Sequence, residues 1–422
     1  MRKSQIIIFI SVTICVCASC CAQIVEIRPL FPCTDKLDEP YGICSHFTQT
    51  SWDYPYQDSL IQITKDLQIS NIRFDLWLPY TEKLQGNKRL SIIQNVVRKN
   101  VLENIGQLGV LFVGWKNQRA WQKKTEYLNF LDTMLMQYKY VIPYWEVMNE
   151  VNETKQKDNV PLDSTILSYM SVLPITYRRI KKANPKIVIT SSGFNDVYDG
   201  FLDLMCKNKS HLFFDVLNFH CYDVPELFPE RFQKISRFME QYKWKKPVWI
   251  TECGFSTYAE KKSLSIVKTI EQKELEQAYR IPRIYLIAFS YGVDKVFIYS
   301  LRSRENNEYE PEDHFGLLHA DLSPKPAYYA YKTLTKMCPN KSTRPKLEKN
   351  GKVYIASWKR PDGKKVWAMW TSKSVVSVEL NTKGKYKIFD IKGDEIHQEG
   401  NDYNITPSIM YFVGAKNINI AN

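Results

Sequence analysis

Short hydrophobic runs alternate with amphipathic segments between residues 41 and 337. The runs are rich in β-branched and aromatic residues, which is typical of buried strands. The intervening segments, such as 59–68 and 274–289, repeat hydrophobic residues at helical spacing. The pattern predicts eight strands, at residues 41–47, 71–78, 110–116, 144–150, 186–194, 216–222, 248–254 and 295–300.

Strands and helices that alternate in this way predict an α/β fold with a parallel sheet covered by helices. We expect residues 41–337 to close into a (β/α)₈ TIM barrel. An open doubly wound sheet is the alternative, but no GxGxxG motif or P-loop follows any of the strands. In a barrel, functional side chains lie at the C-terminal ends of the strands.

The pattern changes after residue 337. Short alternating strands are separated there by PDGK, TKGK and KGDE, which are typical hairpin turns. We therefore predict a small C-terminal antiparallel β-sandwich domain at residues 338–422. The N-terminal segment 23–40 precedes the barrel and is expected to add a strand to this sandwich.

Residues 1–22 have the pattern of an export signal, with Arg2 and Lys3 before an apolar run and small residues. The apolar run is too short to span a membrane. The sequence CASC resembles a lipoprotein box in which Cys20 carries the lipid, whereas cleavage after Ala22 would release a soluble protein. We expect an exported protein, either a periplasmic or outer-surface lipoprotein or a secreted one.

Composition narrows the class of protein. A hydrophobic content of 44% excludes disorder, and an aromatic content of 13% suits either an aromatic core or a cleft that stacks sugar rings. The net charge is +13, and removal of Arg2 and Lys3 leaves 13 − 2 = +11. A uronic-acid or sulfated glycan is therefore expected as substrate if several basic residues line the barrel mouth, and a neutral glycan is the equally favoured alternative. No nucleic-acid partner is expected, because no recognised binding module accompanies the charge.

Ten cysteines are present, and four of them lie in the export segment. The other six have no CxxC or zinc-ligand spacing, so we expect no metal and no cofactor. Most of them suit buried positions, although a disulfide between Cys33 and Cys338 remains an alternative in an oxidising compartment.

Two of the expected strands, YWEVMNE at 144–150 and VWITECG at 248–254, deliver a glutamate near their ends. In a barrel the fourth and seventh strands face each other across the mouth, so Glu150 and Glu252 are expected to approach. Glycoside hydrolysis needs two opposed carboxylates of this kind. For either glutamate alone, a solvated loop position or a structural ion pair is the alternative.

The stretch YWEVMNEVNE resembles the acid/base strand of the clan A glycoside hydrolases and is most similar to family 39, while VWITECGFS resembles the nucleophile strand. The resemblance covers the whole barrel. It implies a retaining glycosidase that acts on an oligo- or polysaccharide by double displacement. Glu150 would be the acid/base, Glu252 the nucleophile, and Asn149 would bind the sugar 2-hydroxyl. Val151 departs from the family, which usually has proline there.

Three further positions fit the resemblance. Arg73 matches the clan's arginine near the nucleophile, where it would favour the ionised carboxylate. His220 and Tyr222 match the clan's H-x-Y motif on the sixth strand. A structural ion pair for Arg73 and a core position for His220 are the alternatives.

The sugar platform is less sharply defined. Many clan members have tryptophan on the eighth strand where this chain has Tyr299, so Trp77, Trp115 and Tyr299 are all candidates. His46 and Asp75 are expected to contact sugar hydroxyls.

Glu146 and Glu153 lie near the proposed acid/base, and we expect both to lie outside the site. A glycan-binding protein on an inactive barrel is the alternative function, but the intact pair Asn149 and Glu150, together with Glu252, favours an enzyme. No HExxH or GxSxG motif supports a metal or serine hydrolase.

Overall fold

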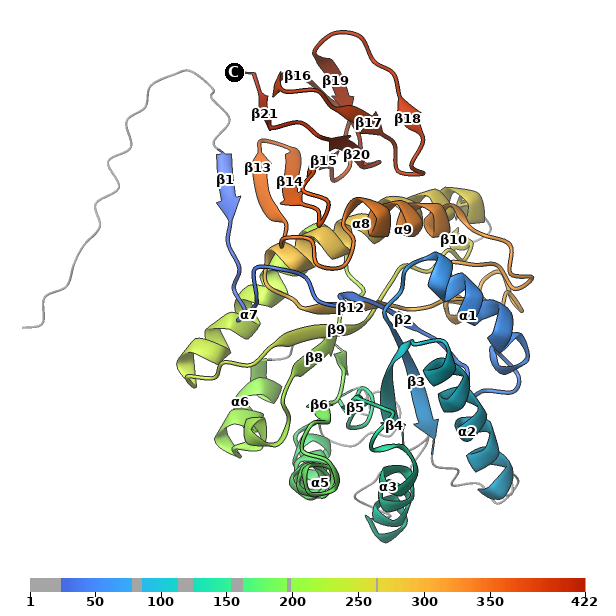
Figure 1. Ribbon diagram of the computed structural model, residues 1–422. Helices are drawn as coiled ribbons and strands as arrows, with labels where there is room; N and C mark the ends of the chain where they lie inside the picture. Colours follow the sequence, from blue (N-terminus) through green and yellow to red (C-terminus); the bar gives the residue numbers. More distant parts are fainter. Residues whose placement is uncertain are drawn as a thin grey trace, which may run out of the picture.

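The computed structural model describes residues 24–77, 86–112, 124–152, 162–195, 199–262 and 265–421. Within these residues the centre of the molecule is a curled parallel sheet of nine strands in the order β6-β5-β4-β3-β2-β12-β9-β8-β7 (Figure 1). The strands are β2 (Tyr41–Cys44), β3 (Asn71–Trp77), β4 (Gly106–Phe112), β5 (Tyr144–Glu146), β6 (Val188–Thr190), β7 (Phe194–Asn195), β8 (Leu217–His220), β9 (Val248–Cys253) and β12 (Lys295–Ile298).

The sheet closes into a barrel because β6 and β7 are two pieces of one barrel strand. β6 pairs with β5 and β7 pairs with β8, in parallel in both cases. A parallel bridge between Thr190 and Val216 joins the two ends of the sheet. The described strands therefore occupy eight barrel positions, and the predicted (β/α)₈ architecture is confirmed.

Helices surround this barrel (Figure 1). They are α1 (Gln57–Asp66), α2 (Gly86–Leu102), α3 (Lys124–Tyr138), α5 (Leu162–Ala183), α6 (Asp199–Lys207), α7 (Phe228–Gln241), α8 (Ile270–Ser290) and α9 (Pro326–Met337). Four short 3₁₀ helices also occur in the described ranges, at Tyr54–Tyr56, Ser210–Phe213, Pro225–Leu227 and Pro311–Asp313. No helix in these ranges is long and apolar enough to cross a membrane.

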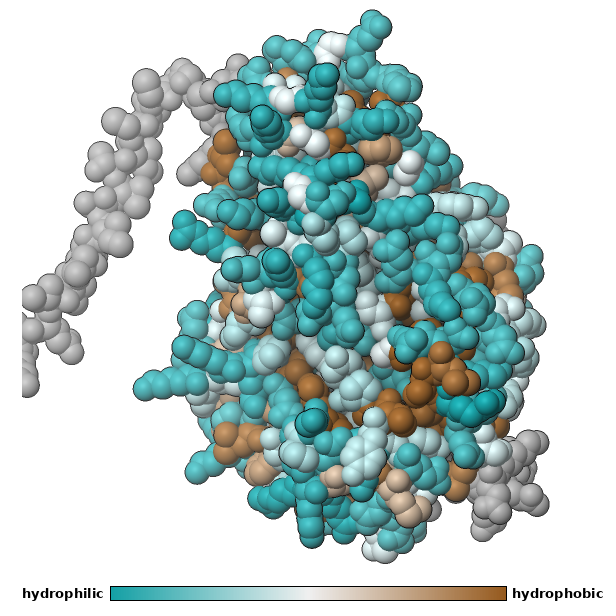
Figure 2. Space-filling view, viewed as in Figure 1, coloured by the Kyte–Doolittle hydropathy of each residue, from teal (hydrophilic) through white to brown (hydrophobic). Residues whose placement is uncertain are grey.

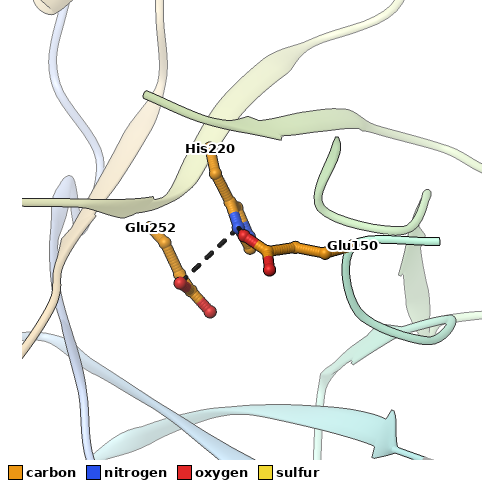
Figure 3. Close-up of side chains that lie close together, drawn as sticks. All are labelled: Glu150, His220 and Glu252. Carbon is orange, nitrogen blue, oxygen red and sulfur yellow. Dashed lines mark hydrogen bonds and ion pairs between the residues drawn. The ribbon is translucent and has the colours of Figure 1, made fainter. Parts of the chain in front are cut away.

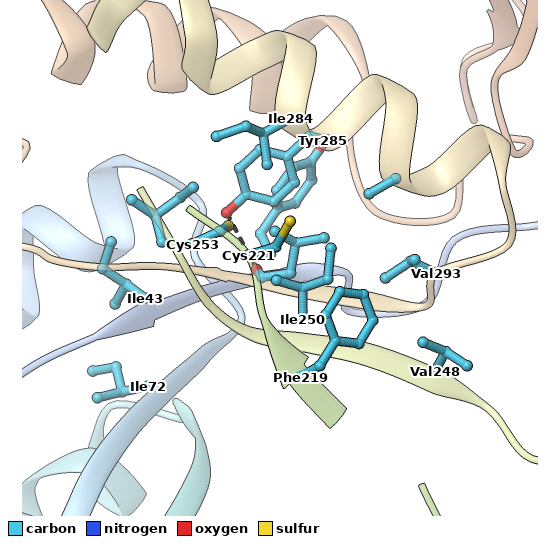
Figure 4. Close-up of a cluster of buried hydrophobic side chains, with 14 of the residues drawn as sticks. Ile43, Ile72, Phe219, Cys221, Val248, Ile250, Cys253, Ile284, Tyr285 and Val293 are labelled. Atoms are coloured by element: carbon cyan, nitrogen blue, oxygen red, sulfur yellow. Dashed lines mark hydrogen bonds between the residues drawn. The ribbon is translucent and has the colours of Figure 1, made fainter. Parts of the chain in front are cut away.

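Helix α8 seals the barrel on the side of β9 and β12. A capping box fixes its start, since the Thr269 side chain accepts from the Gln272 backbone and the Gln272 side chain accepts from Thr269. Tyr285 packs over the strands together with Ile284 (Figure 4). The Tyr285 hydroxyl lies 3.2 Å from the carbonyl oxygens of both Gly42 and Val296.

Several strands differ from the sequence prediction. β5 ends at Glu146, although residues 144–150 were expected to be extended. The backbone turns there because Met148 and Glu150 have φ values of 66° and 42°. β4 begins at Gly106, earlier than predicted, because Gly106 and Gly109 weaken the hydrophobic pattern of its first half.

A hairpin that the sequence did not predict follows β9. It consists of β10 (Glu260–Lys262) and β11 (Ser265–Lys268), which pair antiparallel.

The C-terminal residues form two antiparallel sheets. One has the order β1-β13-β14-β15-β20-β17-β18 and the other β19-β16-β21. Hydrophobic side chains from both sheets share one core cluster, as expected for a β-sandwich. The strands are β1 (Ile24–Ile27), β13 (Lys346–Asn350), β14 (Val353–Lys359), β15 (Lys365–Thr371), β16 (Val376–Lys383), β17 (Lys387–Phe389), β18 (Glu395–Ile396), β19 (Asp402–Ile405), β20 (Met410–Val413) and β21 (Asn417–Ile420).

The segment before the barrel reaches this sandwich. β1 is an edge strand of the larger sheet and pairs antiparallel with β13. The cysteines in the described residues are free thiols, so the structure contains no disulfide between Cys33 and Cys338.

The sandwich is fixed to the barrel through buried polar contacts. The indole N–H of Trp370 on β15 donates to Glu226 Oε1 at 3.3 Å. Arg283 on α8 lies 3.3 Å from the same carboxylate oxygen and donates to the carbonyl oxygen of Thr371 at 3.1 Å. Residues of both parts also belong to one continuous hydrophobic core.

Replacement of Trp370 by alanine should lower the free energy of unfolding by about 3–5 kcal/mol, because the side chain is fully buried and its removal leaves a cavity. Denaturant unfolding followed by circular dichroism measures the change. Val375→Ala is the matched control, since Val375 is 62% exposed. Equal stability of the two variants would contradict a joint core.

Candidate active site

A cavity of about 790 Å³ opens at the C-terminal ends of the barrel strands. Its volume is within the range of about 300–1,000 Å³ that is typical of small-molecule sites. Side chains from six barrel strands, or from the residues directly after them, line it. Predicted site residues on this lining are His46, Arg73, Asp75, Asn149, Glu150, Tyr222, Glu252 and Tyr299.

Glu150 and Glu252 face each other across this cavity. One carboxylate oxygen of each, together with a ring nitrogen of His220, lies in a group whose members are within 4.8 Å of one another (Figure 3). Glu252 is on β9, whereas Glu150 is in the turn after β5. The backbone N–H of Glu150 donates to the carbonyl oxygen of Gly193 at 2.9 Å, which fixes this turn.

His220 lies between the two carboxylates. Its Nδ1 is 2.7 Å from Glu150 Oε1 and 3.5 Å from Glu252 Oε2. Burial by itself lowers the pKa of His220, but the negative charges of Glu252 and Glu150 outweigh it, and the pKa is raised. The imidazole is therefore electrostatically coupled to both carboxylates.

Gly193 makes room for the His220 ring. It lies in the break between β6 and β7, and a Cβ atom at this position would stand 2.0 Å from His220 Nε2. A side chain at position 193 would displace the imidazole from Glu150.

Arg73 on β3 holds the Glu252 side of the site together. Its Nη1 donates to Glu252 Oε1 at 2.5 Å, and its Nη2 donates to Asn149 Oδ1 at 2.7 Å. Its Nε and Nη2 also donate to the two carboxylate oxygens of Glu146 at 2.9 Å each. This guanidinium thus links three barrel strands.

Burial alone would raise the pKa of Glu252, but His220 and Arg73 lower it further than burial raises it. A hydrogen bond from the Tyr222 hydroxyl at 2.7 Å also favours the ionised form. Burial raises the pKa of Tyr222, so this hydroxyl remains a donor. Glu252 is consequently held as a carboxylate.

The opposite wall of the cavity is aromatic. The His46 ring stacks on Trp52 with 3.5 Å between ring centroids, and His46 Nε2 lies 3.0 Å from the Tyr299 hydroxyl. That hydroxyl in turn donates to Glu312. Burial lowers the pKa of His46 to about 3, so its ring is neutral and can both donate and accept.

Two more acids lie in the cavity wall. Burial raises the pKa of Asp75 to about 6, although Arg73 counteracts it. Burial also raises the pKa of Glu312, despite the hydrogen bond from Tyr299.

Among the other candidates, Trp77 is half-buried at the end of β3 and is not part of the described cavity lining. Trp115 and Glu153 lie outside the described residues. Glu146 lies outside the described cavity lining, as expected, but it is fully buried and forms a bidentate pair with Arg73 of the site. The one sequence signal for this ion pair was a charged residue, Glu146, in an otherwise apolar strand.

Sequence reasoning also missed Trp52, Arg304 and Glu312, which all line the cavity. The loop at 302–316 supplies two of them, and its charged and aromatic sequence RSRENNEYEPEDHFG after the eighth strand was the available signal.

Glu150, His220 and Glu252 also present a donor set that could hold a divalent cation. However, Glu252 accepts hydrogen bonds from Arg73 on one oxygen and from Tyr222 on the other. A metal ion would have to displace these donors and would lie beside a guanidinium that repels it. Glu150, His220 and Glu252 are therefore better suited to proton transfer and nucleophilic attack than to metal binding.

Comparisons with known proteins show similarities in sequence and in fold. Residues 117–296 match a family model described as the glycosyl hydrolase catalytic core. A family 39 glycoside hydrolase from the gut symbiont Bacteroides cellulosilyticus has 20% sequence identity and a TM-score of 0.69, over 90% of this chain and 81% of that one. No curated protein sequence matches the chain.

Two further solved structures share the fold. A monomeric β-xylosidase from Caulobacter crescentus has 12% identity and a TM-score of 0.61, over 90% of this chain and 97% of that one. A family 30 subfamily 8 xylanase from Clostridium acetobutylicum has 9% identity and a TM-score of 0.57, with the same coverage of 90% and 97%.

The fold is thus that of the (β/α)₈ glycoside hydrolases. The catalytic-core match and the shared fold support a glycosidase. The chain is similar to clan A enzymes, and one of the matched structures is from family 39.

The Glu252→Gln variant should lower the pKa of His220, because the variant removes the negative charge that lies 3.5 Å from Nδ1. Nuclear magnetic resonance of ¹³C-labelled histidines, titrated with pH, measures this. The resonance of His211, which faces Lys246 instead of a carboxylate, is the internal control. If the pKa of His220 is the same in the variant and the wild type, the charge of Glu252 does not stabilise the protonated imidazole.

Proposed function

We propose that the protein is a retaining glycoside hydrolase in which Glu252 is the nucleophile and Glu150 the general acid/base. The observation that carries this proposal is the approach of two carboxylates to within 4.8 Å in a cavity at the barrel mouth. Retaining enzymes keep their two carboxyl groups about 5–5.5 Å apart, whereas inverting enzymes need about 6.5–9.5 Å to admit a water molecule.

The surroundings of the two carboxylates support different roles. Glu252 accepts from Arg73 and Tyr222, so it is ionised and oriented for attack on an anomeric carbon. Glu150 contacts His220, a group able to share or release a proton near neutral pH. One carboxylate is thus stabilised as an anion, and the other can exchange a proton.

In the first step Glu252 attacks the anomeric carbon while the bond to the leaving oxygen breaks, and Glu150 protonates that oxygen. In the second step Glu150 removes a proton from water, which attacks the same carbon and releases Glu252. Asn149 Oδ1 accepts from Arg73. The amide NH₂ of Asn149 is therefore left to donate to a substrate hydroxyl.

The cavity favours a neutral glycosyl unit at the point of cleavage. Its cations are already paired, since Arg304 lies 2.8 Å from Asp313 and Lys273 pairs with Glu260. Asp75 and Glu312 add carboxyl groups to the wall. Arg73, Lys273 and Arg304 do line the cavity, as the expectation of an acidic glycan requires. Each of them is paired with a carboxylate, however, so we infer a neutral unit at the point of cleavage.

Trp52 lies between His46 and Arg304 and supports the His46 ring from behind. The rings of His46 and Tyr299 are the aromatic groups that this wall offers to a neutral pyranose. We therefore assign the sugar platform to this wall.

The two glutamates should fail in distinguishable ways. Glu252→Ala should reduce hydrolysis of every substrate by on the order of 10⁴-fold or more. Glu150→Ala should reduce hydrolysis of unactivated glycosides far more than that of activated aryl glycosides, because a good leaving group needs little protonation. Steady-state kinetics on a panel of aryl glycosides and oligosaccharides measure both effects.

Azide distinguishes the two roles further. It should restore turnover of Glu150→Ala and give a glycosyl azide of retained configuration, whereas any rescue of Glu252→Ala should give the inverted product. Glu308→Ala, an exposed carboxylate on the loop at 302–316, is the matched control and should behave as wild type. A retained azide product from Glu252→Ala would reverse the assignment. No hydrolysis of any glycoside by the wild type would favour a glycan-binding protein on an inactive barrel.

We further propose that the protein is exported and carries a lipid on Cys20. The support is the basic start, apolar run and CASC sequence of residues 1–22, which lie outside the described residues. Attachment at a membrane surface would hold the enzyme close to an extracellular glycan.

Full-length protein and the Cys20→Ala variant should fractionate differently after expression. We expect the wild type in the detergent-soluble membrane fraction and the variant in the soluble exported fraction, because the variant lacks the lipidated thiol. Immunoblots of the fractions measure this. Release of both proteins to the same extent would refute the anchor but leave secretion intact, while retention of both in the cytoplasm would refute export.

A further inference from the structure

A second cavity, of about 470 Å³, is lined by residues of α9 and of the C-terminal sheet. We call it the basic cleft. Figure 1 shows α9 beneath the C-terminal strands. Tyr329, Lys332 and Lys336 of α9 line one side. Arg360, Phe389 and Lys392 line the other, from the turn after β14 and from the β17–β18 hairpin.

The basic cleft lies at the opposite end of the barrel from the catalytic cavity. Its lining includes Gln68, just after the C-terminal end of α1, and Met337, the last residue of α9. Barrel helices run antiparallel to the strands, so their C-terminal ends lie beside the N-terminal ends of the strands. The catalytic cavity lies at the C-terminal ends, so the two sites do not overlap.

The charge of the basic cleft is unbalanced. Its described lining contains four cations and no carboxylate. Lys332 pairs with Asp66 at 2.6 Å and Arg360 approaches Asp362 at 3.4 Å.

The remaining two cations have no such partner. Lys336 and Lys392 are exposed, and within the described residues neither has a carboxylate at ion-pairing distance. The Nε of Arg360 is buried and lacks a hydrogen-bond partner in the same part of the chain. These groups leave positive charge and a hydrogen-bond donor available to an anion.

Aromatic side chains accompany the charge. Tyr329 is 42% exposed, and Phe389 is half-buried on the other side. Flat apolar ring faces of this kind suit the C–H faces of sugar rings. A concave site with aromatic walls and four cations fits a short acidic glycan segment better than the broad, flat surface of a bilayer.

The close approach of the two sides is built into the backbone. Gly393 has a φ of +90°, and a Cβ atom there would stand 2.9 Å from Thr333 Oγ1. The left-handed turn therefore needs glycine, and it brings the lysine before it against α9.

We propose that the basic cleft binds an acidic segment of a glycan chain. Carboxylate or sulfate groups would lie between Lys336, Arg360 and Lys392, and a sugar ring would pack on Tyr329. We choose a glycan over other polyanions because the proposed function is glycoside hydrolysis, and the inference rests on that proposal. A polymer held here has a raised effective concentration at the catalytic cavity, which cleaves a neutral unit of the same chain.

Affinity gel electrophoresis and calorimetry of the full-length Glu252→Gln protein test this inference. The probes are oligogalacturonate and a sulfated oligosaccharide, with neutral xylan for comparison. We expect binding of the acidic probes that weakens as salt rises, and at least a tenfold loss in the Lys336→Ala/Lys392→Ala double variant. Tyr329→Ala should also weaken binding. Lys352→Ala/Lys383→Ala, which removes the same charge from exposed positions outside the cleft, should bind as well as the parent.

Equal binding by the two double variants would overturn the inference, and so would equal binding of neutral xylan and the acidic probes. Tighter, Lys336-dependent binding of duplex DNA or of anionic phospholipid vesicles would assign the cleft to another polyanion and also overturn it.

Failure of the inference is distinguishable from failure of the proposed function. On the wild-type background, the cleft variant should keep the kcat/KM for small aryl glycosides and lose rate only on acidic polymers. If the wild type hydrolyses no glycoside but binds acidic probes through the cleft, the inference holds and the proposed function fails. If the cleft variant is an active glycosidase with unchanged binding and unchanged rates on acidic polymers, the inference fails and the proposed function holds.

Discussion

The catalytic half of the barrel depends on the buried guanidinium of Arg73, which joins β3 to Glu146 at the end of β5, to Asn149 after it and to Glu252 on β9. A buried charge is costly unless it is paired and hydrogen-bonded, and the loss of one partner leaves the others uncompensated. Two carboxylates around one cation leave a negative excess, which the adjacent His220 offsets when it is protonated. The ionised state of Glu252 is thus a property of the whole cluster, and the cluster also fixes the register of three strands.

The sequence predicted what depends on local patterning. Alternating hydrophobic runs gave the barrel, and the glutamates at 150 and 252 could be assigned because strand ends converge in this fold. The partner of Arg73 on β5 could not be predicted, since Glu146 and Glu150 are equally polar and the turn that separates them arises from positive φ values at Met148 and Glu150. Of the aromatic wall, His46 and Tyr299 were predicted, whereas Trp52 and Glu312 were not. The last two lie far apart in the sequence and meet only through long-range packing.

The net charge of +13 does not describe the charge of the catalytic cavity. Each cation in the described cavity lining has a carboxylate partner. The electrostatic potential in the cavity is therefore set by these ion pairs and not by the net charge of the chain. Charges at the basic cleft are separated from the cavity by the length of the barrel, which exceeds a Debye length of about 8 Å at physiological salt. The same excess charge can therefore attract an acidic chain at one end of the molecule without making the catalytic cavity attractive to acidic sugars.

The break between β6 and β7 is the one interruption of the described barrel strands, and it contributes directly to the chemistry. Gly193 lies in this break against the His220 ring, and a Cβ atom there would stand 2.0 Å from Nε2. The same break lets Gly193 accept from the backbone N–H of Glu150 and donate to Glu146 Oε1 at 3.2 Å. One glycine thereby fixes the turn that carries Glu150, supports the Glu146 carboxylate that holds Arg73 and leaves space for His220 between Glu150 and Glu252. The regular barrel supplies the two strand ends that face each other. The break between β6 and β7 positions the turn with Glu150 and leaves room for His220 between the two glutamates.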